Sequence, residues 1–137
     1  MSCSCDENPP SAFWQETRRA RKAHTCRECA GPINPGDSYR HVRGVWDCEP
    51  DTIKTCSACL KLEAWVVEVG ACRPCLGDVI EDAQQELCYM GGPWSEIRRQ
   101  WWQGARLYVQ ARQRQSKAWV ARRLAKAKAA AALQEAP

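Results

Sequence analysis

The chain has little of the material from which a large hydrophobic core is built. Its 137 residues contain a single Phe and two Met, and Ile is scarce. The longest apolar runs, such as 64–67, are a few residues long, whereas a membrane-spanning helix needs about 20. The first residues, MSCSCDE, have neither the basic start nor the apolar stretch of a secretory signal. We therefore expect no membrane contact, a cytoplasmic location, and a fold that needs support besides its core.

Histidine is almost as rare, and its scarcity argues against several enzyme classes. His24 and His41 are the only two, and neither stands at ligand spacing from a cysteine pair. A zinc nuclease needs a catalytic His and a metal with an open coordination position, which a site of four sulfurs does not offer. His41 and Cys48 would supply a base and a nucleophile, but no third orienting group is evident. We therefore expect a protein that binds rather than catalyses.

Cysteine, by contrast, is abundant and paired. Eight of the ten cysteines fall into four closely spaced pairs: Cys3/Cys5, Cys26/Cys29, Cys56/Cys59 and Cys72/Cys75. In all of these pairs except Cys3/Cys5, two intervening residues let one tight turn aim both sulfurs at one ion, and two such turns complete a tetrahedral site typical of zinc. In a reducing cytoplasm we expect metal ligands, and the even number of cysteines leaves a disulfide framework as the alternative. The pattern thus predicts a zinc-stabilised fold with two zinc ions.

The first predicted site consists of Cys26, Cys29, Cys56 and Cys59. Its first pair, followed by Gly31, predicts a knuckle, because glycine accepts a backbone conformation that a Cβ resists. Residues 34–37 (NPGD) predict a turn, and 38–42 and 52–55 predict strands. Residues 56–69 predict a helix with an apolar face and the second cysteine pair in its first turn. Knuckle, hairpin and helix in this order make a small α+β fold of the treble-clef type.

The second predicted site takes its ligands from Cys3, Cys5, Cys72 and Cys75. It requires the N-terminus to lie beside a predicted helix over 76–87, which has an apolar face and early acidic residues that suit the helix dipole. Cys88 is an alternative ligand, and terminal cysteines are also often free thiols. Cys48 belongs to no pair, and we expect it to be an incidental thiol.

Several spaced motifs together resemble a group of known proteins. They are CSCDENPP at 3–10, ARKAHTCRECAGPINPGDSYRHVRGVWD at 20–47 and TIKTCSACLKLEAWV at 52–66, followed by a further cysteine pair and an acidic helix. Over residues 3–88 the chain is similar to small uncharacterised zinc-binding proteins of phages and prophages. The resemblance implies a treble-clef-like zinc fold encoded by mobile elements, acting in the host-cell cytoplasm, and it implies no particular activity.

Charge sets the C-terminal part of the chain apart. Residues 47–96 hold ten acidic and three basic side chains, whereas 97–134 hold ten basic ones and no acid. The residues Gly91-Gly92-Pro93 interrupt regular secondary structure, and no further Pro follows until the last residue. We therefore expect a zinc-binding body over 1–92 and a basic amphipathic helix over 93–137, so that the C-terminal half is mainly α-helical.

Two patterns run along this predicted helix. One is an apolar stripe of Ile97, Trp101, Ala105, Tyr108 and Trp119, flanked by Trp102, Val109 and Val120. The stripe predicts packing on the zinc body or against a second copy, which would be a homodimer through this helix. The other is a set of cations at spacings of 7 and 11 that share a different face: Arg99, Arg106, Lys117 and Lys128. That face suits phosphates, although a basic face is often only solvated, or lies here against the acidic segment.

Two binding functions follow from these patterns. In the first, the zinc body is a scaffold, and the helix contacts nucleic acid or a nucleoprotein through its cations. Trp101, Trp102 or Trp119 would then be available to stack on unpaired bases. In the second, the protein inhibits a host machine, such as a defence complex, by docking through the tryptophan stripe or the acidic surface. The patterns favour nucleic acid by a small margin and do not distinguish DNA from RNA.

Overall fold

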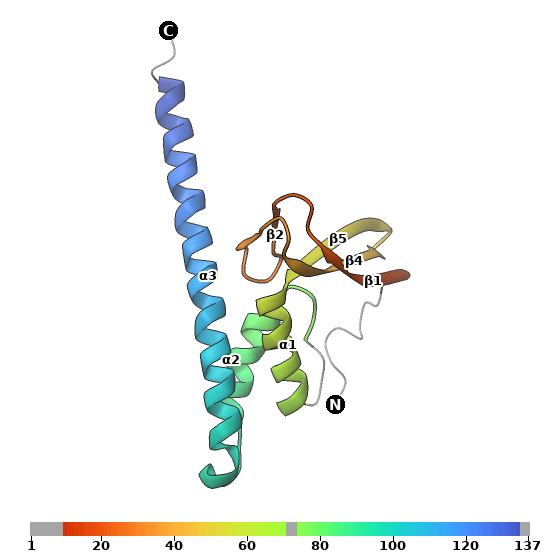
Figure 1. Cartoon of the computed structure of the whole chain (residues 1–137), viewed down its shortest axis with the longest axis vertical. Coiled ribbons are helices and arrows are strands. Elements are labelled where there is room, and N and C mark those ends of the chain that lie inside the picture. The colour runs from red at the N-terminus through yellow and green to blue at the C-terminus, as the bar shows by residue number, and fades with distance from the viewer. Residues whose placement is uncertain (1–9, 71–73, 135–137) are drawn as a thin grey trace.

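The computed structural model describes residues 10–70 and 74–134 and has a small α+β fold (Figure 1). The described strands are β1 (Ala12–Arg19), β2 (His24–Thr25), β3 (Pro32–Ile33), β4 (Ser38–Trp46) and β5 (Glu49–Cys56). The described helices are α1 (Ser57–Val69), α2 (Val79–Tyr89) and α3 (Trp94–Gln134). The predicted α+β class is confirmed, and the C-terminal half is helical as expected.

Three of these strands form an antiparallel sheet with β4 in the centre, paired with β1 on one side and β5 on the other. The predicted strands over 38–42 and 52–55 are both present but longer, as β4 and β5. Strand β1 was not predicted from the sequence. Its residues AFWQETRR are almost all exposed, so no burial pattern marks them as a strand. It forms because the free edge of β4 offers a full ladder of backbone partners.

A two-residue turn joins β4 to β5. Its residues, Asp47 and Cys48, have positive φ angles of 50° and 65°, which is the geometry of tight hairpin turns whose twist matches that of the strands. Beside the turn, the Trp46 ring lies over Gly44, where a Cβ would come within 2.2 Å of the indole. Cys48 is therefore held at the exposed tip of the hairpin.

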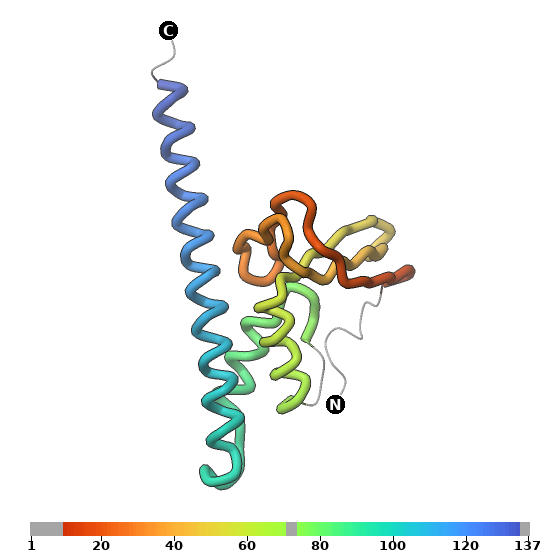
Figure 2. Tube along the Cα trace, viewed as in Figure 1, coloured from red at the N-terminus to blue at the C-terminus, as the bar shows by residue number. Residues whose placement is uncertain are grey.

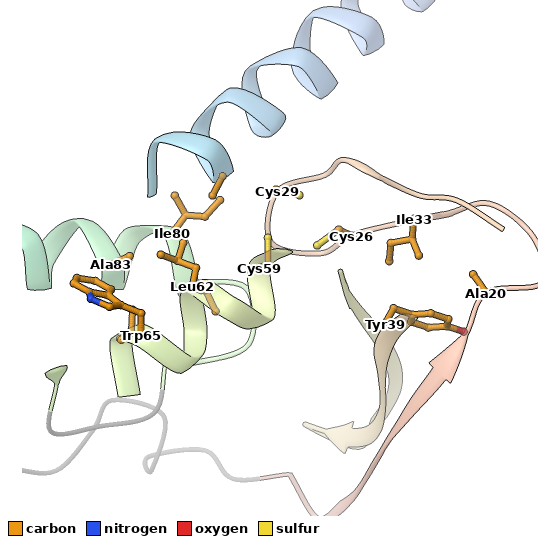
Figure 3. Close-up of a cluster of buried hydrophobic side chains, with 13 residues drawn as sticks. Ala20, Cys26, Cys29, Ile33, Tyr39, Cys59, Leu62, Trp65, Ile80 and Ala83 are labelled. Atoms are coloured by element: carbon orange, nitrogen blue, oxygen red, sulfur yellow. The ribbon is translucent and has the colours of Figure 1, made fainter. Parts of the chain in front are cut away.

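Helices α1 and α2 pack on each other and supply much of the core. The predicted apolar faces are confirmed, because α1 buries Leu62, Trp65 and Val66, and α2 buries Val79, Ile80 and Ala83. Figure 3 shows three cysteines between two apolar groups, with Ala20, Ile33 and Tyr39 on one side and Leu62, Trp65, Ile80 and Ala83 on the other. The cysteines thus lie where the strand part of the fold meets the helical part.

Helix α3 has two halves with different surroundings. In the proximal half, residues 94–118, Gly104 and Ala111 are buried where the helix packs on α1 and α2. The Trp65 ring lies on Gly104, where a Cβ would come within 2.0 Å, and its indole N–H donates to the Gln100 carbonyl at 2.9 Å. In the distal half, residues 119–134, every residue is exposed, and Figures 1 and 2 show it running beyond the rest of the molecule.

The length of α3 raises the question of a membrane span. Within the described residues, no helix combines the length and the apolar character that crossing a bilayer requires.

Candidate metal centre

Two segments far apart in the sequence bring four sulfurs together. Cys26 and Cys29 come from the turn between β2 and β3, while Cys56 ends β5 and Cys59 lies in the first turn of α1. Their Sγ atoms all lie within 4.8 Å of one another, and the Cys29 and Cys56 sulfurs are 3.9 Å apart. Cys26, Cys29 and Cys59 are fully buried, and Cys56 is half-buried. This four-cysteine cluster is the first site predicted from the sequence.

The knuckle that carries the first pair, residues 26–31, is closed by its own backbone. The Cys26 N–H donates to the Gly31 carbonyl at 2.9 Å, and the Arg27 N–H donates to the Lys54 carbonyl of β5 at 2.8 Å. The sequence interpretation assigned the unusual backbone conformation to Gly31, but Ala30 is the residue with positive φ, at 54°. Gly31 matters for a different reason, since a Cβ there would make a tight contact of 3.2 Å with the Cys29 sulfur.

The sulfurs strongly influence one another's protonation. Contact with the Cys26 sulfur, and then with the other two, lowers the pKa of Cys29, and contact with Cys26 also helps to lower the pKa of Cys56 to about 7. The pKa values of Cys26 and Cys59 are raised by contacts with the neighbouring sulfurs and by burial. Four thiolates cannot remain this close without a cation, since like charges at such distances repel. A bound metal ion would remove that conflict.

Backbone N–H groups and one arginine surround the cluster with positive charge. The Cys56 N–H donates to the Cys26 sulfur at 3.3 Å. From the middle of α3, the Arg114 Nη2 donates to the Cys59 sulfur at 3.9 Å. Burial acts against the charge on Arg114, but its contacts with the Cys29 and Cys59 sulfurs raise its pKa overall. No sequence pattern pointed to Arg114, because it lies 55 residues from Cys59 in the sequence and only tertiary packing brings the two side chains together.

Glu28, inside the knuckle, connects the cluster to α2. Its carboxylate is buried and accepts the N–H groups of Gly77 at 2.8 Å and Val79 at 3.2 Å, at the start of that helix. Asp78, the N-cap residue, makes no side-chain cap itself. Burial raises the pKa of Glu28, while the two N–H groups oppose that shift. The sequence interpretation missed this role, although an acid placed between two ligand cysteines was the available signal.

A buried ion pair fixes the sheet to α1 on the other side of the cluster. Arg40 of β4 and Glu63 of α1 meet in a two-pronged contact, with Nη1 to Oε1 at 2.7 Å and Nη2 to Oε2 at 2.6 Å. Both side chains are nearly excluded from water. The second cysteine pair, at the junction of β5 and α1, is thereby held between two elements that cannot rotate independently.

The geometry of the four-cysteine cluster fits a tetrahedral metal ion. Metal–sulfur bonds of about 2.3 Å in a tetrahedron give sulfur–sulfur edges of about 3.8 Å, close to the 3.9 Å between Cys29 and Cys56. Four protein ligands would leave no open position for a substrate or water. The cluster could therefore hold a metal ion, and its ligand set is that of a structural site.

The second predicted site is not tested by the structure. Cys3, Cys5 and Cys72 lie outside the described residues. Cys75 is described, in the segment that leads into α2, and is disulfide-bonded. Cys88, the alternative ligand, is an exposed free thiol near the end of α2. The second zinc ion stays a prediction.

The two histidines lie on the sheet side of the molecule. His24 Nδ1 is 3.1 Å from the Lys54 Nζ. His41 is buried in the centre of β4, edge-on to the rings of Trp14 and Tyr39. Cys48 lies seven residues away at the hairpin tip, so the base and nucleophile weighed in the sequence analysis are not brought together.

The predicted contact residues of α3 fall on two sides of the helix. Arg99, Arg106, Lys117 and Lys128 are all exposed. At about 3.6 residues per turn they project from the side opposite the buried Gly104 and Ala111. This outward face is free of acidic side chains from residue 97 to the end of the described helix.

The predicted apolar stripe is divided between the body and solvent. Its members Ile97, Trp101, Ala105 and Tyr108 are half-buried toward the body. Trp101 donates its indole N–H to the Leu87 carbonyl at 3.1 Å, and the Tyr108 hydroxyl donates to Gln84 Oε1 at 2.9 Å. The other members are exposed: Trp102, Val109, Trp119 and Val120. Of the two alternatives for the stripe, packing on the body is present over the first part of the helix, and a homodimer through α3 stays a prediction.

Comparison with known proteins adds no relative to this description. No protein-family model matches the chain, and no curated protein and no solved structure matches it. The similarity to phage and prophage proteins therefore stays an expectation that rests on the motifs alone.

Proposed function

We propose that this is a non-enzymatic binding protein of phage or prophage type, in which a zinc-held body presents the outward face of α3 to nucleic acid or a nucleoprotein. The observation that carries the proposal is the position of Arg99, Arg106, Lys117 and Lys128. All four are exposed and lie opposite the side that packs on the body. A cationic face directed away from its own protein is available to phosphates.

Zinc is the metal we propose for the four-cysteine cluster. A buried tetrahedron of four thiolates is the ligand set that zinc takes in structural sites. The order of the elements, from the β2–β3 knuckle through the β4–β5 hairpin to the first turn of α1, supports a treble-clef arrangement. When bound, zinc would neutralise the thiolates and join the knuckle to the hairpin. Its part in the proposed function is to hold the body that orients α3.

The distal half of α3 supports contact with a long, charged partner. It carries Arg122, Arg123, Lys126 and Lys128 without a compensating acid, and all of its residues are exposed. A helix held at its proximal end and free over its distal turns can lie along a groove of a duplex or along a single strand. The Arg112 guanidinium, in contrast, lies 4.0 Å from Glu81 of α2 and belongs to the body side.

A second candidate function is inhibition of a host protein complex by direct docking. It is favoured by apolar side chains that share the outward half of α3 with the cations. Trp102, Val109 and Val120 are 59%, 50% and 48% exposed. Exposed aromatic and aliphatic side chains in one row are typical of helices that dock in a protein groove. A homodimer through α3 would use the same row.

The salt dependence of binding separates the two candidate functions. Fluorescence anisotropy with labelled duplex DNA, single-stranded DNA and RNA should give a slope of log affinity against log salt of about −0.9 per phosphate contact on duplex and about −0.7 on single strands. Four contacts then predict a slope of roughly −3 to −4. The variant with Arg99, Arg106, Lys117 and Lys128 all changed to Gln should flatten the slope.

Single substitutions provide a charge-matched control. Each of the four changes to Gln should reduce the steepness by somewhat less than one unit, whereas Lys61→Gln, an exposed cation on α1, should leave it unchanged. Binding that persists in the quadruple variant, or a slope that is flat in the unmodified protein, would reject the electrostatic interface. Protein docking through Trp102 and its neighbours would then be the better explanation.

A further inference from the structure

The three-stranded sheet has two chemically different faces. Because β1, β4 and β5 pair in register, residues directly opposite each other project to the same side. One side is turned toward α1 and includes Val42, Ile53, Thr55 and the ion-paired Arg40, all buried. The other side, which we name the Trp14 face, carries Trp14, Glu16, Arg18, Tyr39, His41, Arg43, Thr52 and Lys54.

The Trp14 face combines an exposed aromatic ring with a surplus of cations. Trp14 is 46% exposed, and Arg43 and Thr52, its register partners on β4 and β5, are exposed as well. Glu16 is the one acid on this face within the described strands, and it is ion-paired with Arg18. Arg18, Arg43 and Lys54 thus outnumber the single carboxylate of Glu16 on the face, and a surplus of positive charge suits a polyanion.

The ring of Trp14 is held in place before any ligand arrives. The Arg18 guanidinium lies over it, with Cζ 5.6 Å from the ring centroid. His41, which is buried, meets it edge-on at 6.2 Å and an interplanar angle of 81°. An aromatic side chain that is already ordered loses little conformational entropy on binding. Arg18, Arg43 and Lys54 bring cations to this face from all three strands. After burial, their charges are the next causes that lower the pKa of His41.

The face leads into an open depression of about 780 Å³ between the sheet, the knuckle and α3. Thr52 and Lys54 line both the face and the depression. The wall toward the knuckle and α3 contributes Arg27, Gln115 and Arg122. Acidic side chains line it as well: Asp78 and Glu81 at the α2 end, and Glu28 of the knuckle, whose carboxylate already accepts the backbone N–H groups of Gly77 and Val79. Lys54 of β5, Arg27 of the knuckle and Arg122 of α3 thus line one depression next to the Trp14 face.

We infer that the Trp14 face binds single-stranded nucleic acid, with one base stacked on Trp14 and the backbone following Arg43, Lys54 and Arg27 toward Arg122 of α3. The inference rests on the proposed nucleic-acid function and names a second surface for it. An exposed ring on a sheet surface stacks on an unpaired base, whereas the bases of a duplex are already stacked on each other. Cations beside the ring hold the strand by its phosphates.

Equilibrium binding of the full chain to labelled oligo-dT, oligo-U and a duplex of equal length tests this inference. Trp14→Ala should weaken binding of the single strands about 5- to 150-fold, the range found for stacking contacts, and should leave duplex affinity within about twofold of the unmodified protein. Trp14→Phe should restore most of the single-strand affinity, because a phenyl ring still stacks. Circular dichroism of each variant confirms that the fold is retained.

Neighbouring residues on the opposite face serve as matched controls. Phe13 is 50% exposed on the same strand, and Phe13→Ala should leave all affinities unchanged. Arg43→Gln and Lys54→Gln should each reduce the steepness of the single-strand salt slope by about 0.7. Arg19 is an exposed cation at the end of β1 on the Phe13 side, and Arg19→Gln should leave the salt slope unchanged. Trp14→Ala should weaken binding without changing the slope, because stacking releases no counterions.

The outcomes separate the inference from the proposed function. If the α3 quadruple variant loses binding while Trp14→Ala does not, α3 is the interface and the inference about the sheet is wrong. If Trp14→Ala weakens single-strand and duplex binding equally, the claim of selectivity for single strands is wrong. If Trp14→Ala weakens single-strand binding and the α3 variant has no effect, the sheet is the interface and the α3 proposal fails. Absence of any nucleic-acid binding would overturn both.

Discussion

The two halves of α3 form one continuous helix, but different interactions stabilise the helical conformation in each half. The proximal half contains Gly104, Tyr108, Val109 and several Trp residues, which favour helix only moderately, or poorly in the case of Gly. The proximal half is stabilised by packing on α1 and α2, above all by its contacts with Trp65. The distal half is rich in Ala, Lys and Arg, which are strong helix formers, and all of its described residues are exposed. One half is held by tertiary packing and the other by intrinsic propensity.

This difference assigns separate tasks to the two halves. Removing contacts from the proximal half should affect stability first and binding second. Changing the distal half should affect binding while the body remains folded, because no core residue depends on it. The expected outcomes below test that division, beginning with the four-cysteine cluster and the metal proposed for it.

Loss of the metal should have the largest effect. Structural zinc contributes about 10–16 kcal/mol of apparent binding free energy in small zinc domains, which is comparable to or larger than the total stability of a domain, about 5–15 kcal/mol. Cys59→Ser should therefore abolish the cooperative thermal unfolding transition followed by circular dichroism, and a strong chelator should do the same to the unmodified protein. Elemental analysis should find at least one zinc per chain, and two if the second predicted site exists.

Cys48→Ser is the matched control, because Cys48 is exposed at the tip of the β4–β5 hairpin. It should leave the unfolding transition nearly unchanged. A fully folded Cys59→Ser protein with normal cooperativity would show that the cluster is not what holds the body together.

Two truncations should separate the halves of α3. Ending the chain after Gly92 removes the cover of Trp65, so we expect an aggregating or unfolded protein. Ending it after Ala118 keeps the packed half, so the melting temperature should change little while nucleic-acid affinity falls. Size-exclusion chromatography and thermal melts measure the first effect, and anisotropy the second. A stable, soluble body after truncation at Gly92 would contradict the division.

Gly104→Ala should destabilise the protein although alanine favours helix. The added Cβ would lie within 2.0 Å of the Trp65 ring, and overpacking of this kind costs about 1–3 kcal/mol. The gain in helix propensity is at most about 1 kcal/mol. Thermal melts should therefore show a decrease of a few degrees. Gly91→Ala is the control, since its nearest neighbour would be the Tyr89 carbonyl at 3.9 Å, and it should cause little change.

A proline in the distal half should have a small effect on stability. Ala127→Pro interrupts the helix where no other element packs on it. We expect less helical signal in circular dichroism and weaker nucleic-acid binding at an unchanged melting temperature. A decrease in melting temperature comparable to that of Gly104→Ala would mean that the distal half contributes to the body in solution, for example through a second copy.

The smallest effect concerns the pH dependence contributed by His41. Burial, and then nearby cations, lower its pKa from the ordinary value of 6.5. Because the unfolded chain binds a proton more readily than the folded one, His41 should reduce stability as the pH falls below about 6.5. An NMR titration of the imidazole should give a pKa below 6.5, and His41→Gln should weaken the pH dependence between pH 6.5 and 5. Titration of His41 at or above 6.5 would contradict this expectation.

The sequence alone predicted the four-cysteine cluster and most of the elements around it. Spacing was sufficient for Cys26, Cys29, Cys56 and Cys59, because ligand pairs in tight turns are a local property. The NPGD turn, the β4–β5 hairpin and the apolar faces of α1 and α2 were likewise readable, since periodicity and turn residues act over a few positions. The start of α3 after Pro93 followed from the chain break.

Only the tertiary structure decided the features that depend on distant partners. Strand β1 has no burial pattern and exists because β4 has a free edge. Glu28 caps a helix that begins 51 residues later, and Arg114 reaches the cluster from 55 residues away. The sequence also did not show where α3 stops packing on the body, because its apolar stripe continues past that point. Local patterns specify which face of an element is apolar, whereas the position of the neighbouring elements determines whether that face is covered.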